Sequence, residues 1–217
     1  MTAKLSIDFV SDVSCPWCAI GLAALEQALE KLDGEVQVEL RFQPFELNPQ
    51  MPPGGQDVTE HLTQKYGSTP EQQAASREAI RLRGESLGFT FRREGRGRVY
   101  NTFDAHRLLH WAEAHDPAGQ RALKKALLGA YFTEGKSPEQ HEVLLGAVAQ
   151  AGLDVEQARV VLGSDAHAAE VREREKFYLD NGIHAVPAVI INGRHLIQGG
   201  QPVEVFEQAL RKIAAEA

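Results

Sequence analysis

The chain has 217 residues, of which 43% are hydrophobic and 24% charged, and this composition is typical of a globular protein and unlike a disordered or fibrous one. Its formal net charge of −7 argues against non-specific binding to nucleic acid, because phosphates require a positive face. No apolar run approaches the roughly 18 residues that a membrane-spanning helix needs. We therefore expect a globular protein with neither a nucleic-acid nor a membrane partner.

The start of the chain and its cysteines favour a cytoplasmic location. Asp8 interrupts the first apolar run, so the first residues lack the pattern of a secretory signal. The chain has two cysteines, Cys15 and Cys18. A pair this close in sequence cannot tie distant segments together. Structural disulfides are also uncommon in the cytoplasm, so we expect this pair to serve another purpose.

The first part of the chain predicts a strand, a helix and a second strand. Residues 5–10 alternate in part, and a helix opens at Cys15 with Pro16 in its first turn, where a missing N–H is tolerated. Gly34 ends that helix, and residues 36–42 alternate strictly. This order is a βαβ unit, for which a right-handed crossover is expected.

The middle of the chain, residues 58–164, shows helical patterns and no convincing strand. Breakers separate predicted helices at residues 70–87, 102–115, 117–132, 138–151 and 154–162. A further helix at 165–179 is ended by Asn181-Gly182, a common carboxyl-terminal signal. This segment therefore has the pattern of an all-helical unit.

Strands return near the end of the chain. Residues 188–191 form a short apolar strand, and Asn192-Gly193 is a strong hairpin signal before the partner strand at 195–198. A final helix at 202–214 is predicted to turn four apolar side chains to the core, namely Val205, Phe206, Leu210 and Ile213. The chain thus closes with a ββα unit.

The pair Cys15 and Cys18 flanks Pro16-Trp17 at the start of the first helix. The first sulfur there faces unpaired backbone N–H groups and the positive end of the helix dipole, and both favour a thiolate. We expect the pKa of Cys15 to lie below the usual value of about 8.5 and Cys18 to be more buried and neutral. This arrangement predicts a redox dithiol in which Cys15 attacks and Cys18 resolves.

Three other interpretations of the pair stay open. A structural zinc site requires four ligands. His106 and His110, four positions apart, could join the two cysteines in a Cys2His2 site. A structural disulfide across two residues would constrain little chain. Inert buried thiols would not explain why the pair follows the first strand directly.

Val186-Pro187 precedes the short strand at 188–191. A proline at the first residue of a strand is tolerated for structural reasons alone. The functional interpretation is a cis-proline packed against the dithiol, with the Val186 backbone free to bind an extended substrate. Together with the cysteine pair and the ββα unit, the pattern favours the functional interpretation.

These segments resemble the DsbA-like branch of the thioredoxin superfamily and, within it, the FrnE-like proteins. The matching segments are residues 12–21 (DVSCPWCAIG), 45–49 (FELNP), 101–108 (NTFDAHRL), 186–187 (VP) and 199–201 (GGQ). The resemblance implies an α/β, thioredoxin-like fold (βαβ … ββα) with an inserted all-helical domain. The thioredoxin-like domain would comprise residues 1–46 and 165–217, the helical domain residues 47–164, and the dithiol would lie between them.

The resemblance also implies roles for single residues. Cys15 would be the nucleophile, Cys18 the resolving thiol and Pro187 the cis-proline beside them. Pro16 and Trp17 would tune the redox potential and offer an apolar face.

On the helical side, the resemblance implies that Asn101 and His106 line the groove. An ordinary half-buried histidine is an equal interpretation of His106, because apolar residues flank it. Trp111 is predicted to belong to the core.

One position departs from the wider superfamily. Thioredoxin and DsbA carry a buried acid on the first strand, six positions before the first cysteine, and this chain has Phe9 there. Strand alternation puts Asp8 on the opposite face. We therefore expect water or Asp12 to handle the proton of the resolving thiol. Pro16-Trp17 also lacks the histidine that helps to make DsbA strongly oxidising.

The predicted function is thiol–disulfide exchange on a protein or small-molecule disulfide, with a recycling reductant or oxidant as partner. No metal or bound cofactor is expected beyond the Cys15–Cys18 disulfide, and glutathione is a candidate co-substrate. One alternative is a glutathione-dependent isomerase or transferase related to hydroxychromene-carboxylate isomerase, although those enzymes usually place Ser at the Cys15 position. A holdase-type chaperone that uses the same groove is another alternative.

Overall fold

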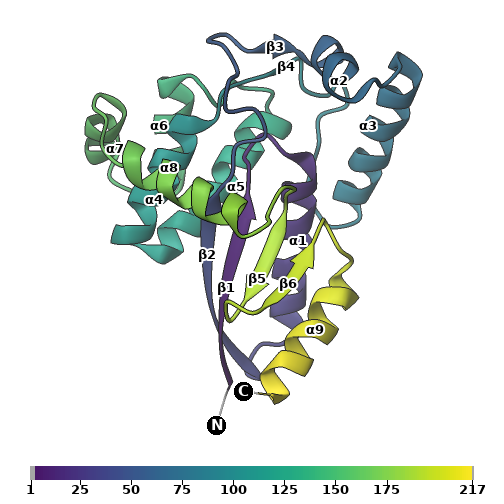
Figure 1. Cartoon of the computed structure of the whole chain (residues 1–217), viewed down its shortest axis with the longest axis vertical. Helices are drawn as coiled ribbons and strands as arrows, with labels where there is room; N and C mark the ends of the chain where they lie inside the picture. The colour runs from purple at the N-terminus through teal and green to yellow at the C-terminus, as the bar shows by residue number, and fades with distance from the viewer. Residues whose placement is uncertain (1–2, 217) are drawn as a thin grey trace.

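A four-stranded sheet with the strand order β2-β1-β5-β6 organises the fold, which a computed structural model describes for residues 3–216 (Figure 1). β1 and β2 are parallel, whereas β5 is antiparallel to β1 and to β6. The strands are β1 (Ala3–Ser11), β2 (Val36–Pro44), β5 (Ala188–Ile191) and β6 (His195–Gln198). The predicted α/β, thioredoxin-like class is confirmed.

Two helices cover one face of the sheet. α1 (Pro16–Lys31) joins β1 to β2, and α9 (Val203–Ala215) follows β6 and packs against α1. The hairpin between β5 and β6 turns at Asn192 and Gly193, whose φ angles of 52° and 62° suit the left-handed turn that this dipeptide predicts. The βαβ and ββα units are therefore present as expected.

The inward face of α9 differs in one residue from the prediction. Val205 is 40% exposed, and Val203 is buried in its place with Phe206. Because the helix begins at Val203, its buried stripe runs through positions 203, 206, 210 and 213.

The segment between β2 and β5 is largely helical. Its helices are α2 (Val58–Tyr66), α3 (Pro70–Glu85), α4 (Phe103–His115), α5 (Pro117–Phe132), α6 (His141–Gln150), α7 (Val155–Leu162) and α8 (Ala168–Asp180). Two short strands, β3 (Gln56–Asp57) and β4 (Arg98–Val99), pair in antiparallel fashion. The expectation of no strand in residues 58–164 is therefore wrong for β4, since two residues are too few to show a periodicity. None of the helices within residues 3–216 is long and apolar enough to cross a membrane.

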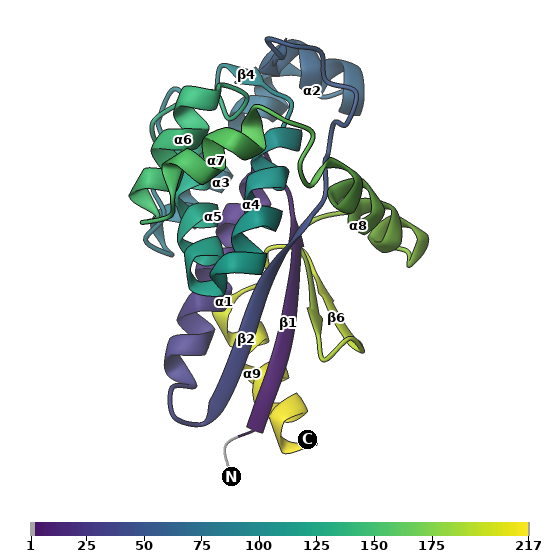
Figure 2. The same ribbon diagram turned by 90° about the vertical axis from the view of Figure 1, so that its left-hand side faces the viewer.

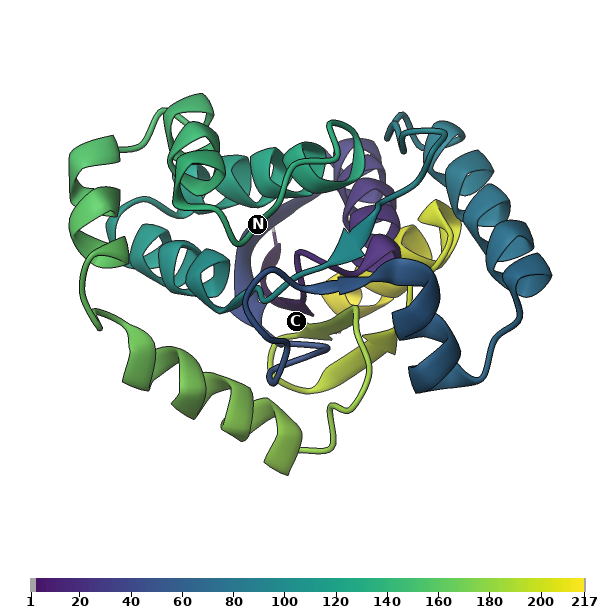
Figure 3. The same ribbon diagram turned by 90° about the horizontal axis from the view of Figure 1, so that it is seen from above.

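The helices lie around the sheet in three groups. In Figure 2, α4 to α7 lie on one side of β1 and β2, and α8 lies on the other. Seen from above in Figure 3, the blue α2 and α3 lie on the opposite side of the molecule from the green α6 and α7. α4 and α5 contact β2, and α3 contacts α1. The end of the sheet near the start of α1 is therefore surrounded by helices.

The edge strand β2 is covered by α5. The side-chain amide of Gln120 accepts a hydrogen bond from Phe42 N at 3.0 Å and donates one to Phe42 O at 3.0 Å. The same amide donates to Leu109 O on α4. A buried glutamine thus satisfies backbone groups that an edge strand leaves unpaired.

Apolar packing continues across the predicted domain boundaries. The core cluster of the sheet, α1 and α9 also contains Leu128, Tyr131 and Phe132 of α5. The cluster among α4 to α7 contains Val13 from the loop after β1. The division into residues 1–46 with 165–217 and residues 47–164 stays a prediction, and the two parts share buried contacts.

Candidate active site

The dithiol lies at the amino-terminal end of α1. Cys15 is the residue that precedes the helix, with φ −94° and ψ 115°, and Pro16 occupies the first turn. Cys18 N donates a hydrogen bond to Cys15 O at 3.1 Å. Cys15 is 4% exposed, Cys18 is fully buried, and both are free thiols. The sequence thus places both cysteines at the start of α1, with Cys15 slightly exposed and Cys18 fully buried one turn further along the helix.

The environment makes the two thiols unequal. A hydrogen bond with Cys18 lowers the pKa of Cys15, helped by the backbone N–H groups of Cys18 and Trp17 and opposed by burial and the Asp12 charge. Burial raises the pKa of Cys18 well above its usual range, as do the hydrogen bond and the charge of Cys15. Cys15 is therefore the sulfur suited to attack as a thiolate.

The loop before β5 lies against the dithiol. The Val186–Pro187 peptide bond is cis, and the Cys15 thiol donates a hydrogen bond to Val186 O at 3.7 Å. A β-carbon added at Gly21 of α1 would lie 3.0 Å from Pro187 Cγ. Only a residue without a side chain lets the proline loop approach the helix this closely.

A second glycine brings the segment after β6 to the site. A β-carbon added at Gly200 would lie 3.1 Å from Trp17 O. Trp17 itself is 43% exposed. The segments 12–21, 186–187 and 199–201, which are far apart in sequence, therefore meet around the two cysteines. The close packing at Gly21 and Gly200 is not predicted by any local pattern, although both glycines belong to the segments that carry the resemblance.

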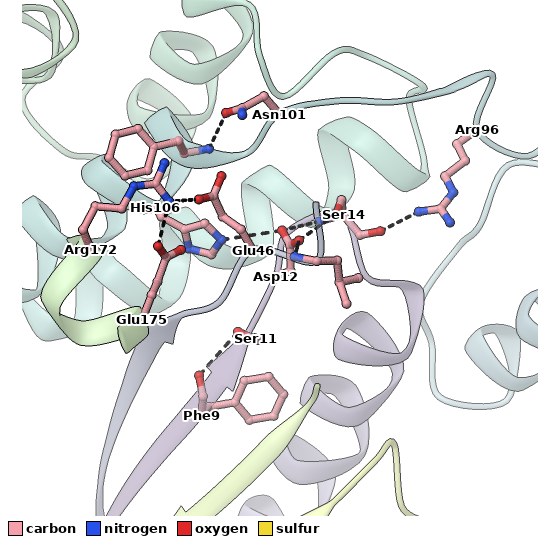
Figure 4. Close-up of polar contacts among 12 residues, drawn as sticks. Phe9, Ser11, Asp12, Ser14, Glu46, Arg96, Asn101, His106, Arg172 and Glu175 are labelled. Atoms are coloured by element: carbon pink, nitrogen blue, oxygen red, sulfur yellow. Dashed lines mark hydrogen bonds and ion pairs between the residues drawn. The ribbon is translucent and has the colours of Figure 1, made fainter. Parts of the chain in front are cut away.

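A buried carboxylate lies in the loop that leads to Cys15. Asp12 accepts hydrogen bonds from Ser14 N at 3.1 Å, Ser14 Oγ at 2.9 Å and Leu47 N at 2.8 Å, as Figure 4 shows. Burial alone would raise its pKa, but His106 and these N–H groups outweigh burial and lower the pKa of Asp12 to about 2. A carboxylate with so low a pKa is a weak base. This argues against the expected role of Asp12 as proton acceptor for Cys18.

His106 lies beneath the surface of the site. Its residue exposure is 2%, and Nε2 lies 3.5 Å from Asp12 Oδ1 (Figure 4). The expectations that His106 lines the groove or is half-buried are therefore both corrected. The reason is that the His106 face of α4 points at the loop after β1. Asn101 also has a local contact, because its Oδ1 accepts from Phe103 N at 2.9 Å at the start of α4. Trp111 is 4% exposed and belongs to the core as predicted.

A cluster of ion pairs, which was not predicted from the sequence, connects α8 to this region. Arg172 of α8 binds both Glu46, just after β2, and Glu175 (Figure 4). Its guanidinium carbon lies 3.8 Å from the centre of the Phe103 ring. Burial raises the pKa of Glu46, and the charge of Glu175 acts in the same sense. The signal was present in the sequence, because Glu46 belongs to the segment FELNP.

A small pocket of about 100 Å³ opens beside Pro16. Its lining includes the apolar side chains of Ile80, Phe91 and Phe132. Four arginines also line it, namely Arg77, Arg81, Arg92 and Arg96. Arg96 also donates a hydrogen bond to Ser14 O. Residues 77–98 hold seven arginines and three glutamates in a chain of net charge −7. The surface beside the dithiol is therefore more cationic than the molecule as a whole.

Within residues 3–216, no group of three or more His, Cys, Asp or Glu side chains is placed to hold a metal ion.

The sheet order, the cysteine pair at the start of α1 and the proline loop opposite define a thioredoxin-fold protein of the dithiol type. Comparison with known proteins gives the family. The chain belongs to the DSBA-like thioredoxin domain family, whose pattern matches residues 6–211. The DsbA-like resemblance of the sequence is thereby confirmed.

Solved structures with similar folds include oxidoreductases and an isomerase. A probable DsbA oxidoreductase from Streptomyces coelicolor is 34% identical with a TM-score of 0.88, over 98% of this chain and 91% of that one. The cytosolic disulfide reductase DsbM from Pseudomonas aeruginosa with GSH is 18% identical, with a TM-score of 0.65 over 95% and 98% of the chains. A 2-hydroxychromene-2-carboxylate isomerase is 17% identical, with a TM-score of 0.68 over 97% of each chain. At these lower identities, the last two show a shared fold.

One curated relative is similar over part of its length. The uncharacterized protein YwbO of Bacillus subtilis (strain 168) is 30% identical over 114 residues, which is 47% of this chain and 54% of that protein. The match therefore spans about half of the relative.

Proposed function

We propose that this protein catalyses thiol–disulfide exchange through Cys15 and Cys18 on a protein or small-molecule disulfide. The observation that carries the proposal is the unequal pair at the start of α1. Cys15 has a lowered pKa and contacts the Val186 carbonyl, and Cys18 lies fully buried one turn below with a raised pKa. Membership in the DsbA-like family supports the oxidoreductase class.

The exchange has two steps. The Cys15 thiolate attacks one sulfur of the substrate disulfide, so that a mixed disulfide forms and the other substrate sulfur leaves as a thiolate. Cys18 then attacks Cys15, the intramolecular disulfide forms, and the second substrate sulfur leaves. The dithiol is oxidised by two electrons and the substrate disulfide is reduced. The reverse sequence would oxidise a substrate dithiol.

The surroundings offer a docking place for an extended substrate. The Val186 carbonyl accepts a hydrogen bond from the Cys15 thiol, and Trp17 and Tyr66 are exposed aromatic side chains. Trp17 is 43% exposed and Tyr66 is 62% exposed. Tyr66 is the last residue of α2, and burial raises its pKa, with the Cys15 charge acting in the same sense. We propose that the substrate chain pairs with the Val186 backbone between these aromatic side chains.

Cysteine variants test the proposal directly. Cys15→Ser should abolish disulfide reductase turnover, because the attacking sulfur is lost, and Cys18→Ser should accumulate mixed disulfides, because nothing resolves them. The chain has two cysteines, so a thiol-trapping mass shift reports on this pair alone. Full reductase activity in Cys15→Ser would contradict the mechanism.

A second candidate is a glutathione-dependent isomerase or transferase. The arginines around the pocket beside Pro16 favour it, because glutathione carries two carboxylates. The structural neighbours include an isomerase and a reductase with GSH. Calorimetric titration of Cys15→Ser with reduced glutathione tests this candidate. Absence of binding would leave dithiol exchange as the proposed function.

We further propose that the protein acts in the cytoplasm with a recycling reductant or oxidant. A neighbour of the same fold is described as a cytosolic disulfide reductase, which supports this location. The holdase activity stays a prediction. It would be supported if a Cys15→Ser/Cys18→Ser double variant still protected unfolded client proteins.

A further inference from the structure

A lysine is buried in the middle of α5. Lys124 has no exposed surface, and among residues 3–216 its Nζ has no hydrogen-bond partner. Lysines are almost never fully buried unless they are paired, because removing an ammonium from water is costly. The side chain therefore requires a compensating charge nearby.

Lys124 shares a face of α5 with Leu128 and Tyr131, four and seven positions further on, and both belong to the core cluster that contains Cys15 and Cys18. α5 also contacts α1, the helix that begins at the dithiol. The charged groups that act on Lys124 therefore belong to the dithiol region. Burial lowers the pKa of Lys124, and the charges of Cys18, Asp12 and Cys15 act in the opposite direction, with Cys18 first. The side chains that α6 buries, Leu144, Ala147 and Val148, are all apolar.

The other charged neighbours of α5 are engaged elsewhere. On the outer side of the helix, Arg121 and Lys125 both pair with Glu26 of α1. On α4, His106 faces Asp12. The electrostatic partners of Lys124 are therefore the two cysteines and Asp12.

Asp12 already has its own partners. Its carboxylate receives Ser14 N, Ser14 Oγ and Leu47 N, and His106 lies 3.5 Å away. The ammonium of Lys124 has no such set of hydrogen bonds. The Lys124 ammonium is thus a buried cation without a hydrogen-bond partner among the described residues. The groups near it that gain a negative charge during exchange are the two cysteines.

We infer that Lys124 is a positioning residue for dithiol exchange, whose buried ammonium stabilises the thiolate of Cys15 and, during resolution, that of Cys18. The inference rests on the proposed function. Where the wider superfamily has a buried acid on the first strand, this chain has Phe9. In this chain the charged side chain near the dithiol is instead Lys124 of α5, which lies inside the predicted helical insertion. The Lys124 charge lowers the pKa of Cys18, which burial otherwise raises.

The Lys124 charge acts on the resolution of the mixed disulfide. In the mixed disulfide, the Cys18 thiol loses its proton, and the resulting thiolate attacks the Cys15 sulfur. The Cys15–Cys18 bond forms, and the bond from Cys15 to the substrate sulfur breaks. The substrate sulfur leaves with the electron pair and takes up a proton equivalent to the one that Cys18 released. A cation near Cys18 lowers the free energy of the charged attacking state.

Lys124→Met tests the inference, with Lys125→Met as the matched control on the exposed side of the same helix. We expect Lys124→Met to raise the pH at which the reduced dithiol ionises, followed by thiolate absorbance, by about one unit or more. The reduction potential of the Cys15–Cys18 pair should fall, because the reduced thiolate form loses its stabilisation. A tenfold change in the equilibrium constant between reduced and oxidised protein corresponds to about 30 mV. Resolution of a mixed disulfide should slow by a similar factor. Lys125→Met should leave all three values unchanged.

Folding is not expected to limit this test. Lys124→Met replaces a buried ammonium by an apolar side chain of similar volume, and no side-chain hydrogen bond is lost, because Nζ has no partner among the described residues. A lysine with a structural role alone would change the melting temperature and leave the thiol titration and the potential as in the wild type. That outcome would overturn the inference. If the wild type itself forms no reversible Cys15–Cys18 disulfide, the proposed function fails instead.

Discussion

Nε2 of His106 lies 3.5 Å from Oδ1 of Asp12, and both side chains are 1% exposed. The contact joins α4 to the loop between β1 and α1, three residues before Cys15. Leu47 N, which follows β2, binds the same carboxylate at 2.8 Å. The loop that carries the attacking cysteine is therefore held at one carboxylate by two segments that lie far away in the sequence. This arrangement links the pH dependence of folding to the geometry of the dithiol.

Asp12 should contribute to stability in a defined pH range. Its pKa is lowered from 3.8 to about 2, so the stabilisation is fully present above about pH 4 and is lost as the pH falls through about 2. The shift corresponds to about 2 kcal/mol. Urea unfolding at a series of pH values should show a smaller loss of stability between about pH 5 and 2 in Asp12→Asn than in the wild type.

Asp33→Asn is the control for this measurement, because Asp33 is exposed. Its pH dependence should match the wild type. If the stability of Asp12→Asn fell between about pH 5 and 2 as much as that of the wild type, the Asp12 carboxylate would not be the group responsible for the loss.

The same substitution should change the dithiol. The negative charge of Asp12 raises the pKa of Cys15, against the larger lowering by the Cys18 hydrogen bond. Asp12→Asn should therefore lower the pKa of Cys15, the opposite of the effect expected for Lys124→Met. Thiolate absorbance against pH measures both variants. A rise in the Cys15 pKa in Asp12→Asn would show that hydrogen-bond geometry outweighs charge at this position.

The sequence predicts the periodic parts of this fold because local patterns define them. The strands β1, β2, β5 and β6, and the helices α4, α5 and α7, begin and end within a few residues of the expected positions. The contacts of the site are different, because they join distant positions. Nothing in a helical pattern separates Lys124, fully buried, from Lys125, which pairs with Glu26 at the surface. The approach of His106 to Asp12 depends on how α4 packs, which no local pattern records.

Gln120 should be important for the joint between α5 and the sheet. Its amide binds Phe42 N, Phe42 O and Leu109 O inside the protein. Gln120→Leu removes the side-chain partner of Phe42 N and Phe42 O on the edge strand, and each such loss costs about 1–3 kcal/mol. We expect the free energy of unfolding to fall by about 2 kcal/mol or more in denaturant titrations. Gln157→Leu, at an exposed position of α7, should have little effect, and an equal effect of both variants would refute the argument.

Glu46 should make the protein less stable at alkaline pH. Burial raises its pKa, so the penalty for ionising it is absent below the usual value of 4.5 and is complete above the folded pKa. Glu46→Gln removes that penalty while Arg172 keeps Glu175 as a partner. We expect a higher melting temperature than the wild type at about pH 8 and none of this gain at about pH 4. Glu142→Gln, exposed on α6, serves as the control. A lower melting temperature at alkaline pH would show that attraction to Arg172 prevails.

The pocket beside Pro16 should select substrates by charge. Arg77 lines it, whereas Arg81 is paired with Glu78 and Glu85. Anionic disulfides such as oxidised glutathione should therefore react faster with the reduced protein than the cationic disulfide cystamine does. Salt should reduce the difference, because exposed charges are screened over about 10 Å at moderate ionic strength.

Arg77→Ala should reduce this preference by roughly two- to fivefold, as expected when one exposed cation is removed. Arg83→Ala, on the same helix but outside the pocket lining, is the matched control and should keep the wild-type preference. Stopped-flow oxidation of the dithiol by each disulfide measures the ratio of rates. Equal rates for the two disulfides in the wild type would mean that the arginines do not face the incoming substrate. In that case, the apolar surface of Trp17 and Tyr66 would be left to determine which substrates bind.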